Sequence, residues 1–379
     1  MPEDPRVRNE ALTLVDGGYE VCVVCPNSRQ QPWYECYNRV HLYRYPAPPD
    51  FGGIFGYAVE YTYSLAVAFV YAGYIFFRRG FDVIHVHSPP DLNCFAAILF
   101  KAFASKKFVL DTHDLSPELY DAQTRGRPSS VIRAALKWLE RVAVRSADLL
   151  IATNESQKRI HVERCGVDPE SYCVVRNGPT EQFLRNDILP ANEIHDESLQ
   201  LIGFVGIIGV QDGVEFLVRA LSEIKHRHRR NDFLGVIVGD GRAKQELEEL
   251  TVELGLSKQV RFTGQVEYSK VPSYIAAFDI CVTPDPSNPY NDSCTTIKTM
   301  EYMALGKPIV AFETAENRRT AKDAALFAPN NDISLLADRI VELMNDEELR
   351  KELGQRGRER ATKHLVWEKQ EFHFAPRVW

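Results

Sequence analysis

The sequence predicts an α/β protein of two doubly wound domains, each with a mostly parallel sheet. The chain has 379 residues, which is more than one hydrophobic core usually serves. Short apolar runs alternate with helical patterns along its length, as is typical of parallel α/β units. A polar, unpatterned stretch at residues 186–198 divides these units into two series, so we expect the domain boundary close to it.

The first series of units forms the expected N-terminal domain, residues 1–182. It opens on a helical pattern at residues 6–16, and a second clear helix is expected at residues 129–146. Buried strands are expected at residues 20–25, 83–87, 107–111, 149–153 and 172–175. Because the series begins with a helix, we expect the strand and glycine-bearing loop that usually open such a domain to be missing.

The second series repeats the alternation and forms the expected C-terminal domain, residues 183–363. Strands are expected at residues 201–205, 234–238, 260–262, 280–283, 309–312 and 326–327. Helices are expected at residues 213–227, 243–254, 271–276, 296–304 and 333–345. Open parallel sheets bind ligands at the carboxyl ends of their strands, so we expect an active site in a cleft between the two domains.

Composition and charge narrow the function classes. The chain is 45% hydrophobic and 26% charged, as in ordinary globular proteins, and its formal net charge is −7. That charge argues against a nucleic-acid binder working through bulk electrostatics. Eight cysteines are too few for a disulfide scaffold, and no signal-peptide pattern opens the chain, so we expect a cytoplasmic protein. Cys22 and Cys25 form a C-x-x-C, but a buried strand explains this pair better than a metal or redox half-site.

An apolar and aromatic stretch at residues 61–77 allows three interpretations. Its 17 residues lie at the lower end of the membrane-spanning range and end at Arg78 and Arg79. We favour a helix packed in or near the N-terminal core over a helix in a membrane interface, with the arginines on lipid headgroups. A true span is the least favoured interpretation. Peripheral association at the inner face of the cell membrane is therefore an open alternative.

The segment from Asn291 to Pro308 carries the clearest chemistry. A polar loop with Ser293, Cys294 and Thr295 leads into a short helix. The start of a helix offers free backbone N–H groups and a partial positive charge, which suit a phosphate. Lys298 adds a cation in the first turns, and Glu301 is placed to accept both hydroxyls of a ribose. The segment therefore predicts a nucleotide diphosphate site, with helix capping and a solvated glutamate as the alternative.

This segment also carries a family resemblance. The run E-Y-M-A-L-G-K-P-I-V at residues 301–310 closely resembles family 4 glycosyltransferases, and the N-D-S-C-T-T-I-K loop resembles branches that act on bacterial surface polysaccharides. The resemblance implies the GT-B fold, two Rossmann-like domains facing across a cleft. It implies transfer of a sugar from a nucleotide donor, with retention of anomeric configuration. It also gives Glu301 the ribose-binding role and makes residues 1–182 the acceptor-side domain, to which the helix at 364–379 would return.

The first half carries a second resemblance, at the end of an expected strand. Val109-Leu110-Asp111-Thr112-His113-Asp114-Leu115 is similar to the histidine-aspartate segment of the same family. The resemblance implies that His113, with Asp114, lies near the donor sugar and the reacting centre.

Further polar side chains follow the same strand ends in the first half. His85, His87 and Asp91 follow a neighbouring expected strand, where acceptor binding and an internally bonded loop are equally favoured interpretations. Glu118 is a further acceptor-side candidate, although a carboxylate at a helix start is its simpler interpretation.

Glycine-rich turns supply the remaining donor-site candidates. Gly206 and Gly209 follow one strand, and Gly239 and Gly241 follow the next, where glycines let a diphosphate approach the backbone. The G-D-G at residues 239–241 also matches the family.

Three positions depart from the family pattern. Ile207 and Asp212 stand where many members have an arginine and a lysine, and Ser293 stands where many have a first glutamate. Phosphate recognition would therefore rest on Lys298 and the start of its helix.

We expect no cofactor and no fixed metal ion, because no D-x-D cluster follows a strand. The expected substrates are a UDP-, GDP- or dTDP-sugar and a glycan or lipid-linked acceptor. Without an evident nucleophile, front-face attack assisted by the leaving diphosphate fits retention. Two alternatives stay open: a sugar-nucleotide epimerase of the same fold, and a catalytically silent sugar-nucleotide-binding protein.

Overall fold

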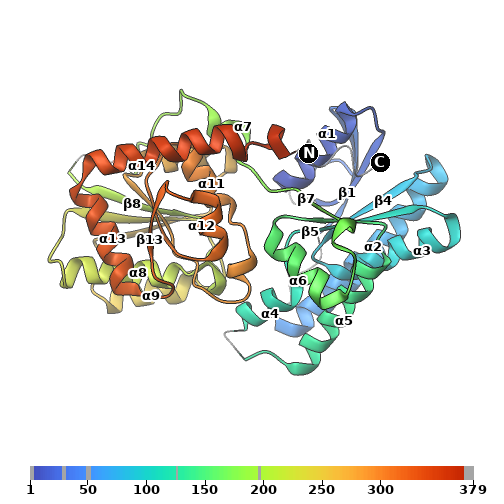
Figure 1. Cartoon of the computed structure of the whole chain (residues 1–379), viewed down its shortest axis with the longest axis horizontal. Coiled ribbons are helices and arrows are strands. Elements are labelled where there is room, and N and C mark those ends of the chain that lie inside the picture. Colours follow the sequence, from blue (N-terminus) through green and yellow to red (C-terminus); the bar gives the residue numbers. More distant parts are fainter. Residues whose placement is uncertain (1–3, 28–30, 48–52, 125–126, 195–197, 371–379) are drawn as a thin grey trace. The chain divides into compact units, whose positions relative to one another are not determined.

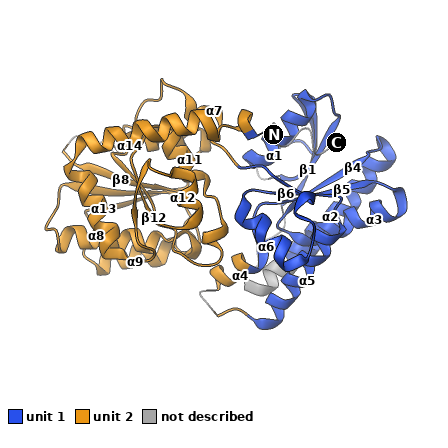
Figure 2. Ribbon diagram, in the orientation of Figure 1, with its two compact units in different colours: residues 1–117, 129–176, 370–379 blue, residues 118–128, 177–369 orange. Residues whose placement is uncertain are grey.

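A computed structural model describes residues 4–27, 31–47, 53–124, 127–194 and 198–370. These residues fall into two compact units, shown in blue and orange in Figure 2. Unit 1 comprises residues 1–117, 129–176 and 370–379, and unit 2 comprises residues 118–128 and 177–369. Each unit is an α/β structure with helices packed on parallel strands (Figure 1).

Unit 1 contains two sheets. The four-stranded sheet has the order β4-β5-β6-β7 and is entirely parallel. Its strands are β4 (Val83–Ser88), β5 (Lys107–Thr112), β6 (Leu149–Ala152) and β7 (Tyr172–Val174). Its core includes Phe108, Leu110 and Leu150, and the surrounding helices are α3 (Cys94–Ala104), α5 (Ser130–Ser146) and α6 (Glu155–Cys165). The buried, β-branched and leucine-rich strands explain why these segments form the centre of a parallel sheet.

The second sheet of unit 1 has the order β1-β3-β2. Its strands are β1 (Val21–Asn27), β2 (Tyr34–Tyr37) and β3 (Val40–Pro46), and α1 (Pro5–Asp16) packs on β1 and β3. The β2–β3 hairpin was not predicted. Its two-residue turn places Asn38 at φ 48° and Arg39 at φ 65°, and these residues lack the Asn-Gly or Asp-Gly signature that marks such turns. Among the described residues, β1 and β4 belong to separate sheets and are not paired. The expectation that an opening strand of this domain is missing stays a prediction.

The apolar stretch at residues 61–77 belongs to a longer helix, α2 (Gly53–Arg78). Ala72 and Ile75 are buried, whereas Val70 and Phe77 are 67% and 88% exposed. One side of this helix therefore packs on unit 1 while another presents apolar side chains to the surface. Across the described residues, none of the helices has both the length and the apolar content needed to cross a membrane.

Unit 2 is a six-stranded parallel sheet in the order β10-β9-β8-β11-β12-β13. The strands are β8 (Gln200–Val205), β9 (Phe233–Val238), β10 (Val260–Gly264), β11 (Ile280–Thr283), β12 (Ile309–Phe312) and β13 (Ala325–Ala328). All six predicted strands are confirmed. Alternate residues of β8 enter separate cores: Ile202 and Phe204 pack on one face, and Leu201 and Val205 on the other. Helices cover both faces, as a doubly wound sheet requires.

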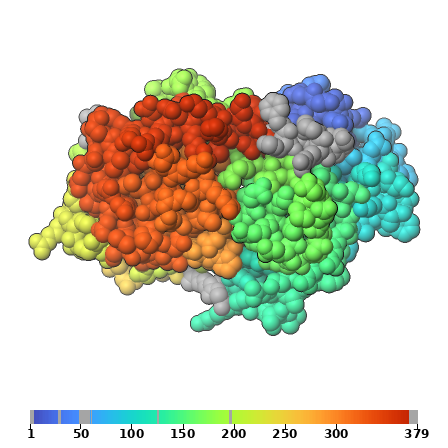
Figure 3. Space-filling view, viewed as in Figure 1, coloured from blue at the N-terminus to red at the C-terminus, as the bar shows by residue number. Residues whose placement is uncertain are grey.

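All five helices predicted for unit 2 are present, together with helices that were not predicted. The predicted helices appear as α8 (Val214–His226), α9 (Lys244–Glu253), α10 (Val271–Ala277), α11 (Ile297–Ala304) and α13 (Ile333–Asn345). Helices of this unit that were not predicted include α7 (Glu181–Leu184), α12 (Ala315–Ala321) and α14 (Glu347–Arg360). In Figure 3, α13 and α14 (red) cover much of the visible face of unit 2. The predicted return of residues 364–379 to the first domain falls mostly on residues outside those described.

Candidate active-site residues

The predicted donor segment forms the loop and helix that follow β11 in unit 2. Lys298 and Glu301 lie three residues apart on α11, which places them on the same side of the helix. Both are buried, at 9% and 6% exposure. A buried ammonium and a buried carboxyl on one short helix are costly unless partners compensate them, so their surroundings decide what this segment can bind.

Lys298 is compensated by two aspartates. Its Nζ lies 2.9 Å from Asp285 Oδ1 and 3.4 Å from Asp212 Oδ1. It also lies 4.8 Å from the centre of the Phe204 ring. Burial opposes the charge of Lys298, but Asp285 and Asp212 raise its pKa. Lys298 is therefore a cation paired with two carboxylates. Sequence analysis did not predict the pairing with Asp285, because that residue lies 13 positions before Lys298 in the chain.

Glu301 has a tyrosine partner. The Tyr268 hydroxyl donates a hydrogen bond of 2.9 Å to Glu301 Oε1. Burial raises the pKa of Glu301 to about 7, and the bond from Tyr268 opposes that rise. Tyr268 lies in a short 3-10 turn outside the motifs described above, and sequence reasoning did not single it out. The alternative of a solvated glutamate is wrong, because Glu301 is 6% exposed.

The polar side chains before α11 bond within the protein. Ser293 Oγ donates to the carbonyl oxygens of Pro289 and Tyr290, at 3.0 and 2.9 Å. Thr295 Oγ1 donates to Glu316 Oε2 at 3.0 Å, and Cys294 Sγ lies 3.9 Å from the Tyr290 hydroxyl. These three side chains shape the loop. The predicted donor-binding role of these three side chains stays a prediction.

Close backbone packing requires glycine at two positions of these turns, Gly239 and Gly241. Gly239 has φ 139°, and a Cβ there would lie 1.9 Å from the Gly206 carbonyl oxygen. A Cβ on Gly241 would lie 2.4 Å from the Ile208 carbonyl oxygen. Gly209 is fixed differently, because its N–H donates to Asp212 Oδ2 at 3.2 Å. The turns after β8 and β9 therefore pack on each other, and a diphosphate contact by these glycines stays a prediction.

In unit 1, the strand ends of β4 and β5 bring the predicted histidines together. His87 Nδ1 lies 3.0 Å from His113 Nε2, and each of these atoms lies 3.3 Å from Asp111 Oδ2. The backbone N–H of His113 donates to the Ser88 carbonyl at 2.8 Å, which aligns the two strand ends. His113 and His87 thus form one cluster around Asp111. Sequence analysis included Asp111 in the histidine-aspartate segment but predicted no role for it.

Asp111 is held by an arginine from α1. Arg6 Nε donates to Asp111 Oδ2 at 2.7 Å, and Arg6 Nη2 donates to Oδ1 at 2.9 Å. Arg6 Nη1 also donates to the Val175 carbonyl at 2.8 Å. Burial alone would raise the pKa of Asp111, but Arg6 and the two histidines hold it well below its usual range. Sequence reasoning missed Arg6, since nothing in a helical pattern shows which arginine will be buried.

The other acceptor-side candidates occupy structural positions. Asp91 is buried and accepts a hydrogen bond from Ser88, which supports the internally bonded loop. Glu118 is buried in the first turn of α4 (Ser116–Gln123), the helix-start position that was its simpler interpretation. The predicted roles of Asp91 and Glu118 toward an acceptor stay predictions. Asp114, which was predicted to act with His113 near the reacting centre, follows it in the loop after β5 and is partly exposed. Its predicted role also stays a prediction.

Comparison with known proteins identifies the class to which this fold and these residues belong. The model of the Glycosyl transferase 4-like domain matches residues 4–178, and the model of Glycosyl transferases group 1 matches residues 186–360. The chain belongs to the GT4 family of GT-B glycosyltransferases, as the resemblance of residues 301–310 implied. It is an enzyme that transfers glycosyl groups.

Individual relatives agree with this family. The chain is 27% identical to an uncharacterized glycosyltransferase of Methanocaldococcus jannaschii over 300 residues, which cover 75% of this chain and 81% of the relative. Its fold is similar to that of a sucrose-phosphate synthase from Thermosynechococcus elongatus, with a TM-score of 0.80 at 19% identity over 97% of this chain and 90% of the other. It is also similar to Anabaena Alr3699/HepE in complex with UDP-glucose, with a TM-score of 0.68 at 15% identity over 94% and 99%.

Proposed function

We propose that the chain moves a sugar, with retention of configuration, from a nucleotide sugar to a glycan or lipid-linked acceptor. The observation that carries this proposal is the pair on α11: the buried ammonium of Lys298 and the buried carboxyl of Glu301 lie on one side of one helix. The ammonium can bind a phosphate group, and the carboxylate can accept hydrogen bonds from two vicinal hydroxyls. A nucleoside diphosphate presents both groups at neighbouring positions. The structural relative with bound UDP-glucose supports a donor of this kind.

The proposed ribose site is Glu301 with Tyr268. Tyr268 donates to Oε1, and a carboxylate has four lone-pair positions, so Glu301 can still accept from ribose hydroxyls. Tyr268 fixes the orientation of the carboxyl before the donor arrives. An oriented acceptor loses less entropy when the ligand binds, which favours affinity.

The proposed diphosphate site is Lys298 with the start of α11. An ammonium has three donors, and Asp285 and Asp212 engage two directions around it. A phosphate oxygen would take the remaining direction and receive backbone N–H groups from the first turn. The two aspartates repel a diphosphate, so this site binds it more weakly than a site with the arginine and lysine of many relatives. Binding energy is therefore concentrated on Glu301.

The proposed catalytic contribution is positioning and electrostatic stabilisation. His113, with Asp114, takes the role near the donor sugar that the family resemblance implies, and Asp111 fixes the ring of His113. The leaving diphosphate gathers negative charge as the glycosidic bond breaks, and Lys298 stabilises that charge. The acceptor would enter on the side of His87, Asp91 and Glu118.

The proposed acceptor class rests on the surface of α2. Val70 and Phe77 on α2 and Phe103 on α3 are 67%, 88% and 85% exposed. Arg78 ends the same helix. Exposed apolar side chains beside a cation suit an interface with anionic lipid, which would bring the enzyme to lipid-linked glycans at the inner face of the membrane.

The test of the proposed function is an incubation of the purified chain with UDP-, GDP- and dTDP-sugars, with and without glycan acceptors. We expect slow sugar release, and faster transfer when a suitable acceptor is present. Binding without turnover would replace this proposal by the silent binding protein, to which the aspartates around Lys298 lend support. An isomerised nucleotide sugar would replace it by the epimerase.

A further inference from the structure

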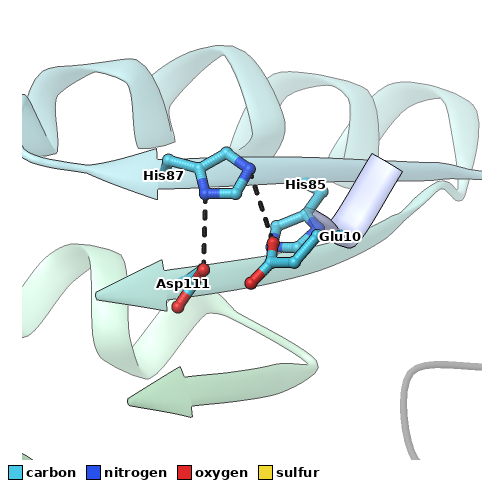
Figure 4. Close-up of side chains that lie close together, drawn as sticks. All are labelled: Glu10, His85, His87 and Asp111. Carbon is cyan, nitrogen blue, oxygen red and sulfur yellow. Dashed lines mark ion pairs between the residues drawn. The ribbon is translucent and has the colours of Figure 1, made fainter. Parts of the chain in front are cut away.

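Unit 1 contains a compact group of two histidines and two carboxylates. Glu10 comes from α1, His85 and His87 from β4, and Asp111 from β5. One ligand atom from each of these four residues lies within 4.8 Å of the other three. Figure 4 shows His87 joined by dashed lines to both Asp111 and Glu10, with His85 beside Glu10. Three separate elements therefore direct metal-ligating atoms at one small volume.

Glu10 is a buried member of this group whose carboxyl oxygens lack a hydrogen-bond partner among the described residues. It is 2% exposed. Arg6 Nε lies 3.1 Å from Glu10 Oε1, but its N–H donates to Asp111. A buried carboxyl without a hydrogen-bond donor indicates that a further group belongs at the site.

The distances suit a four-coordinate ion. His85 Nε2 and His87 Nε2 lie 3.8 and 3.9 Å from Glu10 Oε2. Ligands at Zn–N and Zn–O bond lengths in a tetrahedron are about 3.4 Å apart. Shifts of a few tenths of an ångström in the side chains would bring Glu10 and the histidines to this spacing.

The chemistry of the ligand set selects the kind of ion. Two imidazoles with two carboxylates suit Zn²⁺ and related transition metals, whereas Mg²⁺ and Ca²⁺ prefer oxygen alone. Arg6 orients Asp111 through two N–H groups, as the outer partners of ligating carboxylates do.

We propose that Glu10, His85, His87 and Asp111 bind one divalent transition-metal ion of the Zn²⁺ class. The ion joins α1, β4 and β5 and compensates the buried carboxyl of Glu10. Because His87 contacts His113, the ion also fixes the side chain next to the proposed catalytic histidine. It is a structural ion of unit 1, and its binding does not depend on the proposed sugar transfer.

The test is metal binding by the full chain after removal of metals with a chelator. Calorimetric titration with Zn²⁺ should give one equivalent, and Co²⁺ should give the visible absorption of a four-coordinate site. Glu10→Gln and His85→Gln should each weaken Zn²⁺ binding by about 100-fold or more, since even loss of an outer partner costs 10- to 100-fold. His41→Gln, which removes a histidine of the same unit outside the group, should bind Zn²⁺ unchanged.

Two results would overturn the metal site. One is absence of Zn²⁺ binding by the unaltered chain, which would leave a proton shared by Glu10 and Asp111 as the compensating group. The other is Zn²⁺ binding that survives in both variants while circular dichroism shows them folded. If both variants unfold, anomalous diffraction from crystals of the unaltered chain grown with Zn²⁺ decides: a peak among the four residues supports the site, and its absence there contradicts it.

Discussion

Glu301 and its surroundings give the most specific prediction at the scale of single residues. Glu301→Ala removes an acceptor for ribose hydroxyls while leaving Lys298 and the start of α11 in place. Hydrogen bonds to a charged group contribute about 1.5–3 kcal/mol, so we expect the nucleotide dissociation constant to rise by about 10- to 150-fold. Calorimetric titration with UDP, GDP and dTDP measures this change.

The matched control for this variant is Glu313→Ala. Glu313 follows β12 in the same unit, and its side chain is exposed and pairs with Arg318. Its removal should leave nucleotide affinity unchanged. Equal affinities for Glu301→Ala and the unaltered chain would remove Glu301 from the donor site.

The pKa of Glu301 predicts how donor binding depends on pH. Burial raises this pKa to about 7, and hydrogen bonds from ribose hydroxyls are stronger to the ionised carboxylate than to the protonated carboxyl. Nucleotide affinity should therefore rise between pH 6 and pH 8. The phosphates of the nucleotide also titrate, so the rise is measured against Glu301→Gln, which cannot ionise. The same slope in both proteins would contradict the role of this carboxyl.

The same group affects the stability of the unliganded chain with the opposite sign. Between its ordinary value of 4.5 and about 7, the folded protein keeps the proton on Glu301 while the unfolded chain has lost it. The contribution of Glu301 to the free energy of unfolding therefore falls as pH rises through this window. Chemical denaturation at pH 5 and pH 7.5 should show that the free energy of unfolding falls less for Glu301→Gln than for the unaltered chain.

Sequence reasoning located Lys298, Glu301 and His113 but not their partners. A strand-loop-helix pattern fixes which residues lie at a strand end, because position along an element follows from local periodicity. Tyr268, Asp285 and the Arg6–Asp111 pair depend on packing between segments far apart in the chain, and local periodicity does not report that.

At the scale of elements, α2 carries the prediction about membranes. If the exposed apolar side of α2 inserts into a lipid interface, the double variant Val70→Asp/Phe77→Asp should lose binding to vesicles containing anionic lipid. Burial of a large apolar side chain contributes about 1.5–3 kcal/mol, so a loss of at least about tenfold is expected. Cosedimentation with vesicles measures it.

Val252→Asp serves as the control for this experiment. Val252 is 67% exposed on α9, in unit 2, and offers a comparable apolar loss away from α2. Its vesicle binding should match that of the unaltered chain. Equal binding by the α2 double variant and this control would show that α2 only packs on unit 1.

The elements themselves show what local sequence can and cannot predict. The strands of unit 2 are confirmed nearly residue by residue, because each is a short apolar run between polar turns. The β2–β3 hairpin mixes aromatic and charged residues and turns at Asn38 and Arg39, so it resembles a loop in sequence. Helix α14 was missed because it is strongly polar, with many charged pairs on its surface and few buried residues.

At the scale of the whole molecule, the fold class could be predicted from the sequence. How this chain would bind a diphosphate could not. Alternating strands and helices predict two parallel α/β units, and the match of two family models over both halves agrees. The replacements Ile207 and Asp212 change how a member of this family can hold a diphosphate. Asp212 pairs with Lys298, the one lysine of α11, so we expect the proposed donor site to recognise phosphate more weakly and to depend more on Glu301.

The most direct test of this account is a crystal structure of the chain with a bound nucleoside diphosphate, UDP first. We expect the ribose hydroxyls within hydrogen-bonding distance of Glu301, and the phosphates beside Lys298 and the first turn of α11. A nucleotide bound elsewhere, with Glu301 still bonded only to Tyr268, would contradict the assignment of this helix as the donor site.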